Sequence, residues 1–209
     1  MAKILAFEDN QQSPPDNNLR KVLGRPTNAE RRSREHLTPD EVKNLMKAAG
    51  DIGRHRLRDR TLILIMFRHG LRVSEAVDLQ WDQVNFKAGT IHINRLKKGK
   101  PGTHYFQGDE MRALRRLRRE QTRNPFIFMT ERGGPLTRST VNKLIERAGR
   151  NAEIEFPVHP HMLRHACGYY LANKGVDTRT IQDYLGHISI AHTVRYTELS
   201  PNKFKGLWS

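Results

Sequence analysis

The sequence lacks the features that mark secreted and membrane-spanning proteins. It has one cysteine among 209 residues, which excludes an internal disulfide and favours a reducing cytoplasm. Its longest apolar block, residues 62–67, is far shorter than the ~20 residues of a membrane-spanning helix. The first fifteen residues turn polar and acidic before a secretory hydrophobic region can develop. We therefore expect a soluble, cytoplasmic protein.

Acidic residues are also too few to balance the basic ones. The chain has 37 Lys and Arg against 22 Asp and Glu, which gives a formal net charge of +15. So basic a chain favours a polyanionic partner, with nucleic acid first and an anionic membrane second. The length is sufficient for one hydrophobic core and at most a small appendage.

The residues from Leu37 onward carry the signals of a folded domain. Thr38 and Glu41 form a capping box, and Pro39 suits the first position of a helix that Gly50 ends. A second helix, over about 58–69, is apolar nearly all round and is expected at the centre of the domain.

A sharp corner is expected after this central helix. Gly70 suits a left-handed cap, so the chain should turn there and present Arg72 at the corner. Ser74 is expected to cap the next short helix, and Glu75 to order Arg72 or pack the helix end.

The periodicity changes to two between residues 84 and 106, with turn residues at Gly89 and 98–102, which indicates a small antiparallel sheet. Helices follow over about 108–121 and 137–149, and the remaining chain is helical with breaks at prolines and glycines. The predicted fold class is α+β and mostly helical, with a small antiparallel β-sheet.

Residues 1–36 are polar and end in a basic run, so we expect a flexible basic arm. The arm is either an inert tail or a segment that grips the DNA backbone or a neighbouring subunit. Residues 37–209 form the folded domain in this interpretation, and only the short arm precedes it.

Five separated residues combine into a site for phosphodiester chemistry. Two arginines can bind the non-bridging oxygens of a phosphate, and a phenol with nearby histidines can supply a nucleophile and proton transfer. His161 and Arg164 are three apart on one predicted helix and should face the same way. The full set is Arg72, His161, Arg164, His187 and Tyr196.

Each of these residues also has an ordinary structural explanation. A buried arginine more often pairs with a carboxylate, a lone histidine more often caps or packs, and most tyrosines pack. His159, His161 and His165 invite a metal site, but no His-Glu-x-x-His pattern or cysteine cluster accompanies them. We expect neither a metal nor a cofactor, and we interpret His165 as a packing or supporting residue.

The order and spacing of these residues resemble the catalytic domain of the tyrosine recombinases, the phage integrase family. The resemblance covers residues 37–209 and centres on HPHMLRHACGYYLANKGVDTRTIQDYLGHISIAHTVRY, residues 159–196. It implies that Tyr196 attacks the scissile phosphate and forms a covalent 3′-phosphotyrosine, with surrounding cations favouring its phenolate. It also implies a lysine that protonates the leaving 5′-oxygen; the motif favours Lys97, with Lys98 as the alternative.

The stretches PHMLRHACGYYLA, IQDYLGH and HTVRYT most resemble the small invertases that flip a fimbrial promoter element. The implied partners are double-stranded DNA with inverted-repeat sites, a homotetramer on two such sites, and accessory DNA-bending proteins. The apolar tail, residues 204–208, is expected to dock on an adjacent protomer or in cis. The alternatives that remain are integration, resolution, type IB topoisomerase activity and a catalytically silent DNA-binding regulator. A DNA partner also implies a location in the nucleoid.

Overall fold

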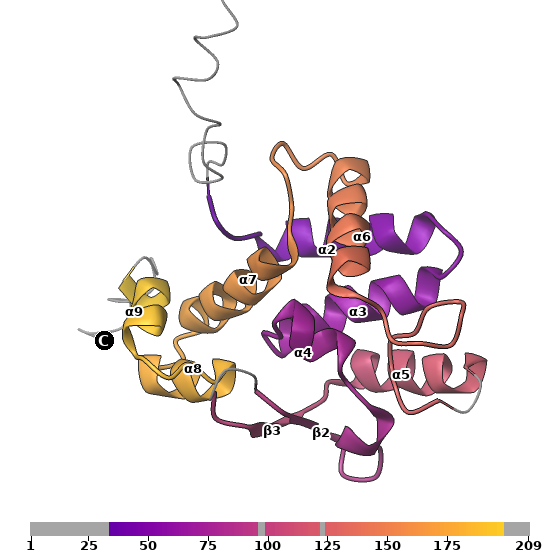
Figure 1. Cartoon of the computed structure of the whole chain (residues 1–209). Helices are drawn as coiled ribbons and strands as arrows, with labels where there is room; N and C mark the ends of the chain where they lie inside the picture. Colours follow the sequence, from indigo (N-terminus) through magenta and orange to yellow (C-terminus); the bar gives the residue numbers. More distant parts are fainter. Residues whose placement is uncertain (1–33, 96–98, 122–123, 199–209) are drawn as a thin grey trace, which may run out of the picture. The chain divides into compact units, whose positions relative to one another are not determined.

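Helices and a small three-stranded sheet at one edge make up the described part of the chain (Figure 1). The computed structural model describes residues 34–95, 99–121 and 124–198. The elements in chain order are α2 (Pro39–Asp51), α3 (Arg56–Arg68), α4 (Val73–Val77), η1 (Trp81–Gln83), β1 (Val84–Asn85), β2 (Thr90–Ile93), β3 (Gly102–Tyr105), α5 (Gly108–Glu120), α6 (Arg138–Asn151), α7 (Pro160–Asn173), α8 (Thr178–Leu185) and α9 (Ala191–Glu198). The predicted fold class is confirmed.

Helix α3 lies at the centre of the domain, as its apolar circumference predicts. It contacts α2, α4, α5 and α7, and its residues from Leu62 to Met66 are all buried. Figure 1 shows α2, α5 and α7 on different sides of this helix. The central position allows α3 to hold the corner that follows its C-terminus.

Helix α2 begins as predicted and ends one residue late. The Thr38 hydroxyl accepts a hydrogen bond from the Glu41 amide, and the Glu41 carboxylate accepts one from the Thr38 amide. The helix continues through Gly50 to Asp51, so the glycine lies in the last turn and does not end it.

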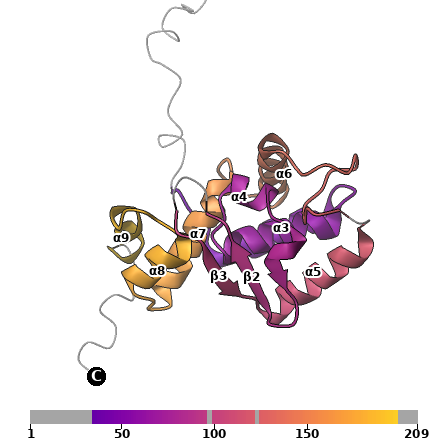
Figure 2. The same cartoon turned by 60° about the horizontal axis from the view of Figure 1, so that its bottom comes forward.

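The sheet is antiparallel in the order β1-β2-β3. Ile91 and Ile93 of β2 are fully buried, and His104 of β3 pairs with Ile91 and shares its buried face. The neighbouring Tyr105 is 76% exposed, so the predicted alternation is confirmed. Figures 1 and 2 show β2 and β3 between α8 on one side and α5 on the other.

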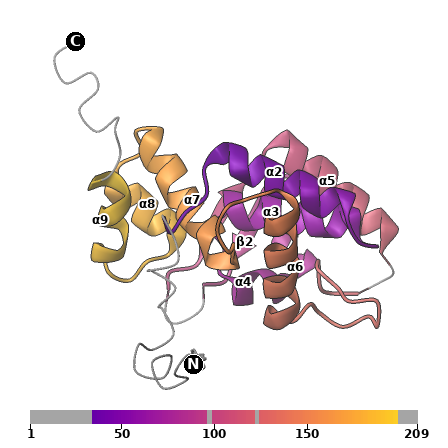
Figure 3. The same cartoon turned by 90° about the horizontal axis from the view of Figure 1, so that it is seen from above.

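A second, smaller hydrophobic cluster joins the last three helices. It is formed by Cys167 and Ala172 of α7, Ile181 and Leu185 of α8, and Tyr196 of α9. Figure 3 shows α8 and α9 grouped beside α7, on the side away from α5 and α6. The residue expected to be the nucleophile is therefore a core residue of this cluster.

Two left-handed glycines turn the chain at the ends of α3 and α8. Gly70 has φ +56°, as the sequence predicts, and Gly186 has φ +65°. After Gly70, the amide of Leu71 donates to the carbonyl of Met66, which closes the corner. The predicted cap at Ser74 is wrong: Arg72 is the N-cap of α4, since the Glu75 side chain accepts from its amide.

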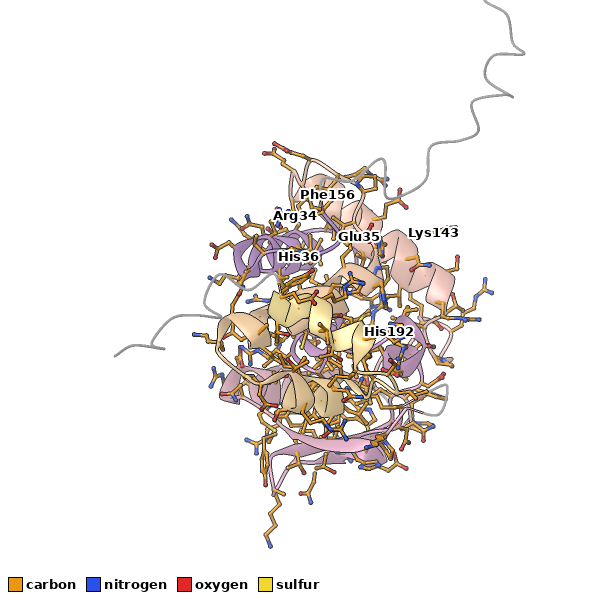
Figure 4. All side chains as sticks on the ribbon, turned by 90° about the vertical axis from the view of Figure 1, so that its left-hand side faces the viewer. Arg34, Glu35, His36, Lys143, Phe156 and His192 are labelled. Atoms are coloured by element: carbon orange, nitrogen blue, oxygen red, sulfur yellow. The ribbon has the colours of Figure 1, made fainter. Side chains whose placement is uncertain are left out.

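Arg34 and His36 pack against the folded domain. The Arg34 guanidinium forms an ion pair with Glu41 and lies 5.3 Å from the centre of the Phe156 ring (Figure 4). The His36 ring lies 4.0 Å from the ring of Tyr169. Residues 1–33 of the expected arm, Lys97, Lys98 and the apolar tail at 204–208 lie outside the described residues. Within the described ranges, every helix is too short or too polar to cross a bilayer.

The corner at Gly70 should not tolerate a side chain. A Cβ there would lie 2.3 Å from Leu185 Cδ2, and the backbone is left-handed. We expect Gly70→Ala to lower the free energy of unfolding by about 2–4 kcal/mol, from the backbone penalty plus overpacking. Gly89→Ala is the matched control, because its φ is +69° and nothing lies within 4 Å of its Cβ. It should cost about 1 kcal/mol; equal losses in urea unfolding would contradict the close-packing argument.

Candidate active site

Glu75 holds Arg72 at the corner between α3 and α4. Its carboxylate accepts hydrogen bonds from the Arg72 backbone amide at 2.9 Å and from Arg72 Nη1 at 2.7 Å. Burial alone would raise the pKa of Glu75, but Arg95 and Arg72 outweigh it and hold that pKa below its ordinary value. The Arg72 side chain remains 25% exposed, so it is fixed on one side and reachable from solvent. The expectation that Glu75 orders Arg72 is confirmed.

Arg164 lies beneath this corner on α7. Its Nη1 donates to the Gly70 carbonyl at 2.6 Å and its Nη2 to the Leu185 carbonyl at 2.7 Å. The same guanidinium is 4.0 Å from Glu75 Oε2. Burial, together with the charges of Arg72 and Arg95, lowers the pKa of Arg164 to about 10. The group is still a cation at neutral pH.

The histidines expected in the site are neutral in the DNA-free protein. Burial of His161, with the nearby Arg164 charge, lowers its pKa to about 4, although part of this side chain is solvent-exposed. Burial and the same guanidinium lower the pKa of His187 to about 3. The His187 Nδ1 lies 2.8 Å from the Thr193 hydroxyl, which fixes the orientation of the ring after the Gly186 corner. Each neutral imidazole has an unprotonated nitrogen, but the lowered pKa makes both rings weak bases at neutral pH until a nearby anion, such as a bound phosphate, raises that pKa.

Tyr196 packs against a gap in α7 that Gly168 provides. A Cβ at Gly168 would lie 2.6–2.7 Å from the Tyr196 ring, so only glycine allows this approach. The Tyr196 ring is 1% exposed, and it stacks with the His187 ring at 6.3 Å and 22°. The nucleophile candidate therefore lies beside His187, inside its own protomer.

The expectation that the surrounding cations favour a phenolate is wrong for this structure. Burial raises the pKa of Tyr196 to about 12, although the Arg164 charge acts in the opposite direction. Desolvation of an anion outweighs the attraction of a guanidinium that is already engaged with two carbonyls. Tyr196 is a neutral phenol at physiological pH.

His165 supports Tyr196, in agreement with the packing or supporting role expected for it. Its Nδ1 lies 2.8 Å from the Tyr196 hydroxyl, and its ring lies 4.5 Å from the His161 ring. Burial is the main cause that lowers the pKa of His165, and the neighbouring His161 is the second. The pKa falls to about 2, so His165 stays neutral. The i, i+4 spacing from His161 placed the two rings together but gave no indication of the contact with Tyr196, which is 31 residues away.

A residue that sequence analysis did not single out is Arg95, directly after β2. It is fully buried and forms an ion pair with Glu75 at 2.9 Å. Of the expected site residues, Lys97 lies outside the described residues, with its alternative Lys98. The described residues contain no group of three or more His, Cys, Asp or Glu placed to hold a metal ion.

The five described candidates form one electrostatic cluster. Arg72 and Arg164 both act on the pKa of His161 and of His187, and Arg164 also acts on that of Tyr196. Two cations, a phenol and neutral imidazoles are thus assembled from α4, α7, the α8–α9 corner and α9. Such a set can bind a phosphodiester and attack it.

The same residues lie within a known family. The model of the phage integrase family matches residues 35–203 of the chain. The chain is a tyrosine recombinase. It therefore belongs to the enzymes that cut and rejoin DNA strands through a tyrosine, and the resemblance inferred from the motifs is confirmed.

Curated relatives of this recombinase match over nearly their whole length. The type 1 fimbriae regulatory protein FimB of Escherichia coli K12 is 42% identical over 185 residues, which cover 86% of this chain and 92% of that protein. FimE of the same strain is 44% identical over 181 residues, which cover 84% of this chain and 91% of that protein.

Solved structures of other recombinases share the fold. The XerA recombinase superimposes with a TM-score of 0.71 at 28% identity, over 83% of this chain and 63% of XerA. XerH bound to its difH substrate gives 0.69 at 26% identity, over 78% of this chain and 50% of XerH. The recombinase thus spans half to two thirds of these longer chains, and the predicted recombinase fold is confirmed.

The buried neutral His165 should make the recombinase acid-sensitive. Its pKa in the folded state is about 2, below the ordinary 6.5. The stability that it contributes is complete above pH 6.5 and is lost as pH falls toward the folded value. Between pH 7 and pH 5 we expect wild type to lose about 2 kcal/mol more unfolding free energy than His165→Gln. Glutamine retains hydrogen-bonding groups without titrating; parallel pH profiles in urea unfolding would contradict a buried neutral histidine.

Proposed function

We propose that this recombinase inverts a DNA segment between inverted-repeat sites and so switches a promoter, with Tyr196 as its nucleophile. The observation that carries the assignment of the site is the contact of Glu75 with both Arg72 and Arg164, together with the stacking of the His187 ring on the Tyr196 ring. The role of inversion is supported by the motifs shared with fimbrial phase-switch invertases and by two relatives named as regulators of type 1 fimbriae.

In the proposed reaction, the Tyr196 oxygen attacks the scissile phosphorus and gives its proton to a neutral imidazole. His165 already shares a hydrogen bond with that hydroxyl, and His161 and His187 lie beside these two rings. The bond from phosphorus to the 5′-oxygen breaks, Lys97 protonates that oxygen, and a 3′-phosphotyrosine remains. A 5′-hydroxyl of the partner duplex then reverses the step, so the energy of the phosphodiester is conserved without a nucleotide cofactor.

Arg72 and Arg164 bind the non-bridging oxygens in this scheme. The charge on these oxygens increases as the attacking and leaving groups are both partly bonded, and a fixed guanidinium fork stabilises it without reorganisation. Both side chains are held before DNA arrives, Arg72 by Glu75 and Arg164 by two carbonyls. Arg72 is therefore oriented and accessible before DNA arrives, whereas Arg164 and Tyr196 are each 1% exposed and must be uncovered when the phosphate binds.

The proposed assembly has four protomers on two DNA sites, with accessory proteins that bend the DNA between them. In this proposal the basic residues 1–36 grip the DNA backbone or a neighbouring protomer, and residues 37–209 are the catalytic domain. The apolar tail at 204–208 docks on the adjacent protomer. Action on chromosomal DNA places the enzyme in the nucleoid.

Tyr196→Phe should abolish covalent attachment to DNA while leaving binding intact, because only the nucleophilic oxygen is removed. The substrate is a duplex nicked just 3′ of the candidate scissile phosphate, so that the short fragment diffuses away after cleavage. A covalent band on a denaturing gel is expected with wild type and with Tyr169→Phe, whose ring contacts Tyr196 at 5.0 Å. Specific binding by wild type without a band would favour the catalytically silent regulator.

Lys97→Ala should slow cleavage by roughly 10²–10³-fold, because the leaving 5′-oxygen loses its proton donor. A substrate with sulfur in place of that bridging oxygen needs no donor, so cleavage should return to near the wild-type rate. Lys98→Ala is the matched control, expected to be near wild type on both substrates. The opposite pattern in the two variants would transfer the role to Lys98.

A further inference from the structure

The side chain of Arg95 lies at the point where three parts of the site meet. It follows β2 and enters the interior, where it is 1% exposed. Its Nη1 donates to Glu75 Oε2 at 2.9 Å, which links it to the corner that carries Arg72. Because burial removes the hydration of this guanidinium, ion pairs and hydrogen bonds within the protein must offset the lost free energy.

The other donors of Arg95 reach backbone carbonyls on two separate segments. Its Nη2 donates to the His69 carbonyl at 3.0 Å and to the Tyr184 carbonyl at 2.6 Å, and its Nη1 lies 3.4 Å from the Gly70 carbonyl. His69 and Gly70 end α3, while Tyr184 lies in the last turn of α8. One planar group thus joins two helix ends that are more than a hundred residues apart in sequence.

The stem of Arg95 also supports the corner that presents His187. A Cβ on Gly186 would lie 2.7 Å from Arg95 Cγ and 3.0 Å from its Cδ. The glycine therefore rests directly on the arginine stem, and the next residue in the chain is His187. The hydrogen bonds and the stem together fix the relative position of the α3–α4 corner and the α8–α9 corner.

Arg95 shares its carboxylate partner with the two arginines of the site. Glu75 accepts from Arg72 and Arg95 and is 4.0 Å from Arg164, so one negative charge faces three positive charges. Glu75 and the carbonyls occupy the donors of Arg95. The 25% exposed Arg72 remains the member of this group that is reachable from solvent.

We propose that Arg95 is a positioning residue for strand cleavage: it sets Arg72, Arg164 and His187 in register around the scissile phosphate without touching DNA. The proposal rests on the site assignment made under the proposed function. If Arg95 only stabilised the fold, its removal would lower the cleavage rate of every substrate by the same factor. A positioning arginine affects most the reaction that depends on the two guanidiniums it places.

The test compares cleavage of two nicked duplexes in single-turnover assays. One carries the normal scissile phosphodiester, and the other carries a methylphosphonate there, in which a methyl group replaces one charged non-bridging oxygen. The methylphosphonate has less need of correctly placed guanidiniums. Arg95→Met should cleave the phosphodiester about 10²-fold more slowly than wild type, as for loss of an oriented charge-stabilising contact. On the methylphosphonate it should remain within about tenfold of wild type.

Two further variants keep the test decisive. Arg58→Met is the matched control, because Arg58 is a largely buried arginine, 11% exposed, that pairs with Asp59 and the Met129 carbonyl. It should leave the ratio of the two cleavage rates unchanged. Arg95→Lys keeps one charge for Glu75 without the planar fork, so it should fold and show a smaller shift of the ratio in the same direction. If Arg95→Met does not fold, Arg95→Lys decides.

Equal loss on both substrates, or a wild-type phosphodiester rate in a folded Arg95 variant, overturns the positioning role. These results leave the proposed site intact, provided that wild type forms the covalent band and Tyr196→Phe does not. If wild type forms no covalent band on a duplex that it binds specifically, the proposed site and the role of Arg95 fall together. A selective loss on the phosphodiester supports both.

Discussion

The site depends on one buried carboxylate, Glu75, that faces three guanidiniums. Each of these charges loses hydration free energy when it is buried, and the ion pairs and carbonyl hydrogen bonds offset only part of that loss. One negative charge against Arg72, Arg95 and Arg164 leaves an excess of positive charge at the corner after α3. The excess is tolerable because Arg72 stays partly in water. In the proposed function an incoming phosphodiester neutralises this excess charge. Binding of DNA thus relieves an imbalance built into the fold.

Helix ends supply the remaining compensation for these charges. Arg95 and Arg164 donate to carbonyls at the C-termini of α3 and α8, where the backbone has unsatisfied acceptors and the negative end of the helix dipole. The left-handed glycines Gly70 and Gly186 let the chain reverse at these ends and leave the carbonyls pointing inward. The same two glycines present Arg72 and His187 to the site. The same type of helix end therefore accepts the buried guanidiniums and presents the two residues that are proposed to bind phosphate.

Local signals in the sequence were sufficient to predict the elements and the corner that presents Arg72. The capping box at Thr38, the period of two over the sheet and the glycine corners are encoded within a few residues of one another, so they could be predicted. The contact of Tyr196 with His165 and the bonds of Arg95 to Tyr184 join residues 31 and 89 apart. No local pattern specifies which long-range partner a buried polar group finds. The ionisation state of Tyr196 was misjudged for the same reason, since its burial against Gly168 depends on how α9 docks on α7.

The raised pKa of Tyr196 separates DNA binding from activation of the nucleophile. An excess of positive charge on its own would pull the phenol toward ionisation before any substrate is present, and a free phenolate beside guanidiniums would occupy the place of the phosphate. Burial in the small cluster of α7, α8 and α9 prevents this, because the anion would lose more hydration than Arg164 returns. The hydrogen bond to His165 keeps the hydroxyl oriented meanwhile. In the proposed reaction the proton of Tyr196 leaves during the attack. The histidines beside it take that proton once the negative charge of the bound phosphate has raised their lowered pKa values.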